Sequence, residues 1–199
     1  MKGCKYRLIL PFILGIILVG CISRAPQTVK QEFEKSATKV IAVLPVNNKT
    51  LDVKAPQLLR SKVLDHLYFK GYPKLLPEVI DSKLEALYKG KKNDGAGFVA
   101  PQVLKELVGA DAVMYCTLSE GKRKVGLFYA PVTMAARCEL RSTQTGEILW
   151  NAEYKSTSRN FDITGKRLEM KSLEAFESVM EEVVNKVMET LPDGPNLRG

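Results

Sequence analysis

The chain has 199 residues and a formal net charge of +8, from 30 basic and 22 acidic side chains. This length is enough for one domain with a sizeable core. The positive charge is modest and scattered along the sequence, with short clusters at residues 89–92 and 122–124. We assign these clusters to solvated loops or to loose attraction to anionic lipid head groups, and we expect no nucleic-acid partner.

Residues 1–20 have the pattern of a secretory signal peptide. Three basic residues open the segment, and the apolar run at 8–19 has about a dozen residues, whereas a membrane-spanning helix needs about 20. Residues 18–21 (Leu-Val-Gly-Cys) match a bacterial lipobox. We therefore expect cleavage before Cys21 and attachment of lipid to its thiol, which would anchor the mature chain to a membrane.

The mature chain divides into three parts. Residues 21–37 are polar and lack a periodic pattern, so we expect a flexible tether there. Residues 38–191 are expected to form one α/β domain. Residues 192–199 contain two prolines and two glycines and are expected to be a loose tail.

The first half of the domain alternates strands and helices. A continuous apolar run predicts a buried strand at 40–44, and Leu59, Val63 and Leu67 recur at four-residue steps, which predicts a helix over 55–70. Further elements are expected as a short edge strand at 72–76, a helix at 77–88, a Gly- and Lys-rich loop at 89–97 and a helix that begins at Pro101 and ends at Gly109.

The second half favours an antiparallel meander. Strands are expected at 112–118, 132–142 and 147–155, and a turn at 143–146 joins the last two. A polar loop at 156–165 and a final helix at 171–191 complete the domain. The sequence thus predicts a single α/β domain whose mixed sheet ends in an antiparallel meander flanked by helices.

Two cysteines remain once Cys21 carries lipid and Cys4 is removed with the signal peptide. Cys116 and Cys138 fall in neighbouring predicted strands and would face each other if the hairpin midpoint lies near Leu127. An exported protein meets an oxidising compartment, where a disulfide is permitted. The alternative is a pair of buried thiols that act as small apolar residues.

The connection between these strands contains Leu127, Phe128 and Tyr129. Apolar side chains at a loop tip can mark contact with a partner or a membrane. The alternatives are that they fold back onto the core or simply extend the hairpin.

Catalytic and metal-binding patterns are missing from the sequence. His66 is the single histidine, and at the edge of a helical apolar stripe it favours a structural hydrogen bond over acid–base catalysis. The paired carboxylates Glu181 and Glu182 are expected to be solvated charge. We therefore expect no enzyme, no metal site and no cofactor.

Four segments together resemble a known family of bacterial lipoproteins. They are the lipobox, residues 40–47 (VIAVLPVN), residues 108–115 (VGADAVMY) and residues 145–150 (TGEILW). The family is typified by a meningococcal surface antigen of unknown function. The first strand and the Gly-Ala-Asp after a helix are also similar to the N-terminal domain of TolB, to CsgG-like secretion lipoproteins and to lipoprotein activators of peptidoglycan synthases.

This resemblance implies an α/β domain, without a known active site, at the periplasmic face of the outer membrane. Ile22, rather than Asp, after the lipid-bearing cysteine fits sorting to that membrane. The resemblance also implies assembly with other envelope proteins, a CsgG-like lipoprotein among them, and homodimer formation. We expect a non-enzymatic adaptor or assembly factor; the alternative is a periplasmic lipoprotein that binds a small molecule or a glycan.

Overall fold

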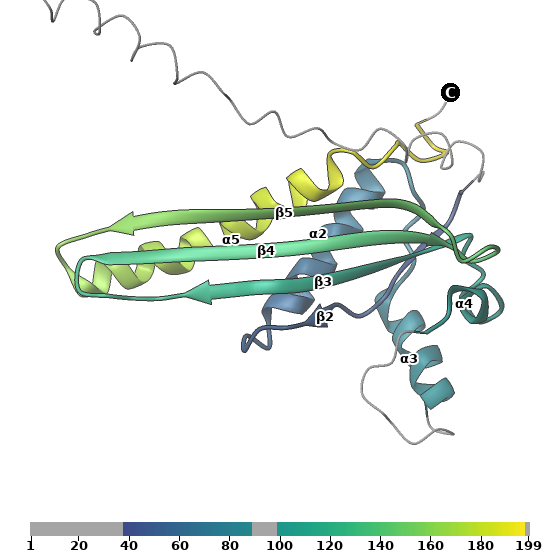
Figure 1. Ribbon diagram of the computed structural model, residues 1–199, viewed down its shortest axis with the longest axis horizontal. Helices are drawn as coiled ribbons and strands as arrows, with labels where there is room; N and C mark the ends of the chain where they lie inside the picture. The colour runs from purple at the N-terminus through teal and green to yellow at the C-terminus, as the bar shows by residue number, and fades with distance from the viewer. Residues whose placement is uncertain (1–37, 89–98, 198–199) are drawn as a thin grey trace, which may run out of the picture.

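The computed structural model describes residues 38–88 and 99–197 (Figure 1). The predicted signal peptide, Cys21, the predicted tether and the loop at 89–97 lie outside the described residues. The elements are β1 (Ile41–Val43), β2 (Asn47–Asn48), α2 (Ala55–Phe69), α3 (Pro77–Tyr88), α4 (Pro101–Val108), β3 (Ala112–Arg123), β4 (Tyr129–Ser142), β5 (Ile148–Phe161) and α5 (Gly165–Met188). Among the described residues, no helix is long and apolar enough to span a bilayer.

The sheet is mixed, as predicted. Its strand order is β1-β3-β4-β5, and β2 also pairs with β3. Strands β1 and β2 run parallel to β3, whereas β3, β4 and β5 form an antiparallel meander. The predicted fold class, a single α/β domain, is therefore confirmed.

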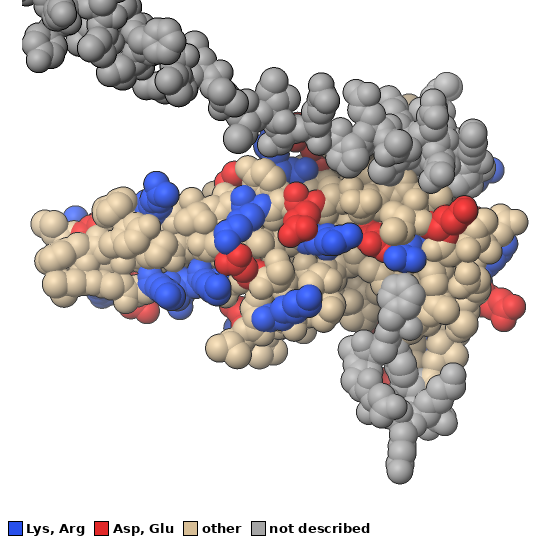
Figure 2. Space-filling view, in the orientation of Figure 1, with Lys and Arg blue, Asp and Glu red and all other residues tan. Residues whose placement is uncertain are grey.

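Helices cover the two faces of the sheet unequally. The larger core lies between one face and helices α2 and α5, and it takes alternate residues of β4 from Val132 to Leu140. A smaller core lies on the other face, where α3 and α4 pack against β1 and the start of β3. The rest of that second face carries charged and polar side chains along β4 and β5, which Figure 2 shows as mixed red and blue.

Polar contacts tie the first helices to the sheet. Arg60 of α2 is nearly buried, donates to the Val43 carbonyl of β1 and forms a two-pronged ion pair with Asp81 of α3. At the end of α4, Gly109 adopts a φ of 67°, the left-handed conformation that glycine tolerates best. Asp111 follows and accepts hydrogen bonds from the backbone N–H groups of Lys39 and Val40, which aligns β1 with β3.

The predicted edge strand at 72–76 is wrong. This segment is irregular, and its buried Tyr72 donates from its hydroxyl to the Pro192 carbonyl instead of joining the sheet. Strand β2, which pairs with β3, lies instead in the connection between β1 and α2. Residues 192–197 pack beside the end of α2, where the Gly194 N–H donates to the Lys70 carbonyl.

Three strands extend further than predicted. Strand β3 continues to Arg123, β4 begins at Tyr129, and β5 runs through most of the predicted loop to Phe161. Helix α5 begins at Gly165 rather than at residue 171. The sequence pattern missed the extensions of β3 and β5 because polar residues dominate them, yet the backbone groups of these extensions pair across β3, β4 and β5.

Candidate functional site at the end of the sheet

The long strands carry the sheet beyond α2 to an exposed end. Here Lys122 pairs with Thr133, which in turn pairs with Thr157 of β5. Their two threonine hydroxyls are 3.0 Å apart. The N-terminal part of α5 lies behind this end in Figure 1.

Six exposed apolar side chains gather there and are called the end cluster below. They are Val125, Leu127, Phe128, Tyr129, Phe161 and Ile163. Leu127 is 77% exposed and Ile163 is 89% exposed. The rings of Tyr129 and Phe161, which are register partners, have centroids 4.8 Å apart.

Backbone hydrogen bonds fix the shape of the end cluster. The Gly126 N–H donates to the Tyr129 carbonyl over 2.9 Å, and the Asp162 N–H donates to the Phe128 carbonyl over 3.2 Å. The candidate contact residues Leu127, Phe128 and Tyr129 are therefore held at the tip of an extended hairpin and do not fold back onto the core. Sequence reasoning missed Phe161 and Ile163 because it placed both in a loop, and the register with β4 is the signal that finds them.

A basic groove lies beside the end cluster. It has a volume of about 900 Å³ and runs between the segment at 49–54, the end of β3 and the first half of α5. Its apolar lining includes Leu58, Leu173 and Phe176. Five basic residues line it, namely Lys49, Lys54, Lys122, Arg123 and Lys124.

Three acidic residues line the groove, Asp52, Glu120 and Glu177 of α5. The first two are engaged with neighbours. Asp52 accepts from the backbone N–H groups of Lys54 and Ala55 at the start of α2. Glu120 pairs with Lys155 and Lys122, and the hydrogen bond from Lys155 is the main reason that the pKa of Glu120 lies below its ordinary value. The groove therefore presents mainly positive charge.

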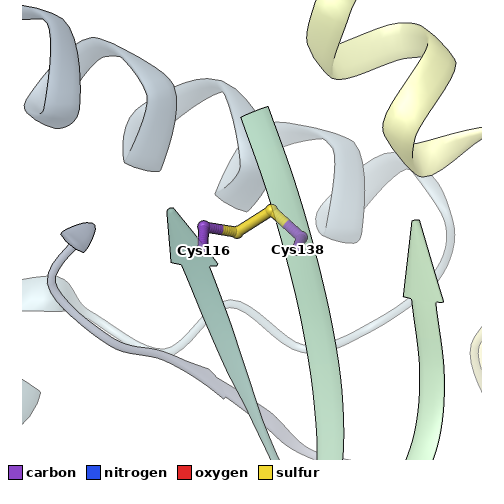
Figure 3. Close-up of a disulfide and its surroundings, with 2 residues drawn as sticks. All are labelled: Cys116 and Cys138. Carbon is purple, nitrogen blue, oxygen red and sulfur yellow. A yellow bond between two sulfur atoms is a disulfide. The ribbon is translucent and has the colours of Figure 1, made fainter. Parts of the chain in front are cut away.

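Cys116 and Cys138 form a disulfide between β3 and β4, below helix α2 in Figure 3. They are register partners, and their Cα atoms are 4.1 Å apart, close to the spacing of the nearer type of antiparallel pair. Both residues lie within the larger core. Of the two alternatives at the sequence level, the structure contains the bridged one.

His66 takes part in a structural contact between helices. Its Nε2 lies 3.6 Å from a Glu181 carboxylate oxygen, and the same carboxylate pairs with Lys62. The hydrogen bond from Lys62 lowers the pKa of Glu181 more than the contact with His66 does. Glu182 accepts from the Ser156 hydroxyl over 2.8 Å. Glu181 is 45% exposed and Glu182 is exposed, so both carboxylates are open to solvent while they also contact these neighbours.

Metal ligands do not converge in the described ranges 38–88 and 99–197, where no group of three or more His, Cys, Asp or Glu side chains could hold an ion. The geometry at the sheet end instead combines an apolar surface, a basic groove and a rigid antiparallel support. Such a combination is typical of a binding surface.

Comparison with known proteins gives the class of this fold, a lipoprotein domain. Residues 30–195 match the family described as putative lipoprotein GNA1162-like, and the chain therefore belongs to that family. A putative lipoprotein of Neisseria meningitidis serogroup B, NMB1124/NMB1162, is 24% identical over 194 residues, which cover 92% of this chain and 83% of the relative.

Solved structures show the same fold. The crystal structure of lipoprotein GNA1162 from Neisseria meningitidis matches with a TM-score of 0.51 and 22% identity, over 70% of this chain and 96% of that chain. The PelC dodecamer from Paraburkholderia phytofirmans matches with a TM-score of 0.50 and 17% identity, over 78% of this chain and 90% of that chain. The predicted family is thereby confirmed.

Proposed function

We propose that this protein is a lipid-anchored, non-enzymatic adaptor or assembly factor of the cell envelope, and that its end cluster contacts another envelope protein. The end cluster is the observation that carries the proposal. Its six apolar side chains come from two separate connections and from the strand ends that adjoin them, yet they form one exposed surface at the end of a paired sheet. Exposed aromatic side chains on a rigid support are typical of the anchors that dominate protein interfaces.

The anchor in this proposal is lipid on Cys21, with retention at the periplasmic face of the outer membrane. The domain begins near the start of β3, because Ile41 pairs with Ala112, whereas the end cluster lies beyond Arg123. A twelve-residue strand is about 40 Å long. The end cluster would thus project away from the anchoring membrane toward a partner.

The test compares partner capture by matched variants in cells that produce the acylated full-length protein. Leu127→Ser with Phe128→Ser removes two members of the end cluster. Tyr68→Ser with Phe69→Ser is the control, because these residues are also exposed but lie at the end of α2. Envelope proteins should co-purify after crosslinking with the wild type and with the control at equal yield, and with the end-cluster variant at several-fold lower yield. Equal yields from all three proteins would contradict the proposal.

The anchor has its own test. Cys21→Ser should abolish acylation and release the domain into the periplasm or leave it attached by an uncleaved signal peptide. Mass spectrometry of the N-terminal peptide and membrane fractionation measure both effects. An acylated, processed Cys21→Ser protein would rule out this attachment site.

A second candidate function is binding of a small molecule or a glycan, which the basic groove favours. Its volume of about 900 Å³ falls within the usual range for ligand sites. Phe176→Trp would narrow the groove and should weaken a ligand found by screening the full-length protein, while Phe69→Trp should not. Binding that is unaffected by Phe176→Trp would exclude the groove as the site.

A further inference from the structure

The positive charge of the protein is concentrated at the sheet end. Residues 119–131 and 155–171 hold eight basic and three acidic side chains, a net charge of +5. The chain from Cys21 to Gly199 also has a net charge of +5, since the first twenty residues contain three basic and no acidic side chains. The rest of that chain is therefore neutral. Figure 2 shows part of this asymmetry as blue side chains next to the tan end of the sheet.

We infer that the basic groove and the end cluster together bind an extended acidic segment of a partner protein, one whose acidic residues alternate with apolar ones. This inference rests on the proposed adaptor function and specifies the chemistry of the partner. The acidic side chains would meet the lysines and the arginine of the groove. The apolar ones would contact the groove lining and the end cluster.

The groove's cations are available for such a partner. Within the described part of the chain, Lys49, Lys54, Arg123 and Lys124 make no side-chain hydrogen bond or ion pair, although all four are exposed. They come from two walls, the 49–54 segment and the end of β3. Unpaired cations on both walls favour an anionic occupant between them, because like charges repel one another and an anion between them relieves that repulsion.

The shape of the surface favours a protein segment over a lipid bilayer. A bilayer contacts protruding side chains, whereas an extended chain can also fill a groove. The start of the domain lies about 40 Å from the end cluster by the length of β3, which favours an orientation of this end away from the anchoring membrane.

Charge also argues against a second copy of this chain. Two sheet ends of net charge +5 would repel each other, and opposed like charges lower affinity and specificity. A partner with the opposite charge gains attraction from the same arrangement. The inferred partner is therefore a different protein.

The experiment places a photo-crosslinking amino acid in the full-length acylated protein, in its own cells. Position 128 probes the end cluster, position 123 probes the groove, and position 105 on α4 is the control. Each probe is combined with the double substitution Lys49→Gln and Lys124→Gln. The matched control is the double substitution Lys39→Gln and Lys105→Gln at the opposite end of the domain. Because this control changes position 105, the control probe is placed at position 83 in that variant. Crosslinked peptides are sequenced, and one is then synthesised with its Asp and Glu intact or replaced by Asn and Gln.

Probes at 123 and 128 should capture one partner segment that is rich in Asp and Glu. Lys49→Gln with Lys124→Gln should lower both crosslinking yields roughly tenfold, because a few screened charge contacts contribute about 1.4 kcal/mol. Replacement of the acidic residues of the synthetic peptide should lower its affinity for the protein by a similar factor. The pair Lys39→Gln and Lys105→Gln should change neither.

Three results would overturn the inference. Capture of a neutral or basic segment, or a yield insensitive to Lys49→Gln with Lys124→Gln, would refute the acidic partner while leaving the adaptor function intact. Crosslinks to phospholipid alone would show a membrane contact instead. No crosslink above the control probes at either position would refute the adaptor function and, with it, this inference.

Discussion

The disulfide between Cys116 and Cys138 should contribute about 3.4 kcal/mol to the free energy of unfolding. The bridge closes a loop with a sequence separation of 22, and the chain-entropy relation for that length gives about 11 cal/mol/K, which yields this value at 25 °C. With a urea m-value of about 2 kcal/mol/M, loss of the bridge should lower the unfolding midpoint by about 1.7 M. Because the two cysteines are 2% and 0% exposed, a reductant should act slowly until the core opens.

The assay is urea unfolding of the full-length protein in mild detergent, followed by far-UV circular dichroism, with and without reductant. Reduction removes no core atom and adds only the two thiol hydrogens, so the shift reports loss of the crosslink with little cavity cost. Cys116→Ala with Cys138→Ala is the control, since reductant should leave its midpoint unchanged. A wild-type midpoint that reductant fails to move, or alkylation of Cys116 and Cys138 in the oxidised protein as read by peptide mass spectrometry, would refute this reasoning.

Three further predictions concern packing and charge. Met180→Ala should lower the free energy of unfolding by about 2–5 kcal/mol, the cost of a cavity at a fully buried position, and a loss below about 1 kcal/mol in urea unfolding would contradict the assigned core. Arg60→Ala should cost about 2 kcal/mol, because it leaves the Val43 carbonyl and Asp81 without their donor; Arg60→Lys should recover part of that loss if the contacts matter. The pKa of Glu181 is lowered in the folded protein, so its stabilisation is present above the ordinary value of 4.5 and is lost as the pH falls through the folded value. The free-energy difference between the wild type and Glu181→Gln should therefore shrink as the pH falls below 4.5, and should stay below about 1 kcal/mol because the carboxylate is 45% exposed; a difference independent of pH would exclude the ion pair.

The elements that the sequence predicted well are those whose apolar residues face a core. The stripe of Leu59, Val63 and Leu67 predicted α2 because all three residues are buried, and Pro101 and Gly109 marked the ends of α4. The segment at 72–76 was predicted as a strand from its apolar residues, but it is irregular, because those residues serve a different purpose. Tyr72 packs in the core and binds the C-terminal segment, which no local pattern encodes.

The candidate site was predicted in part, and for a related reason. Loop residues 127–129 were found because apolar side chains in a connection are conspicuous. Phe161 and Ile163 were missed because their neighbours are polar, although β5 brings Phe161 against Tyr129. The sequence also did not show how the positive charge is arranged, since basic residues far apart in the sequence meet at one end only after β3, β4 and α5 have been aligned.

Membrane attachment, partner binding and stabilisation by the disulfide are assigned to different places along the length of the molecule. Single substitutions should therefore affect one of these properties without the others. The proposed anchor joins one end, the end cluster occupies the other, and the disulfide lies between them in the larger core. Substitution of exposed end-cluster residues should change the free energy of unfolding by only about 0.5 kcal/mol, while reducing partner capture. Loss of the disulfide should lower the free energy of unfolding but leave partner capture unchanged at temperatures where the domain stays folded. An end-cluster variant such as Leu127→Ser that unfolded several kcal/mol more easily would show that this surface belongs to the core, and both proposals for the sheet end would then lose their basis.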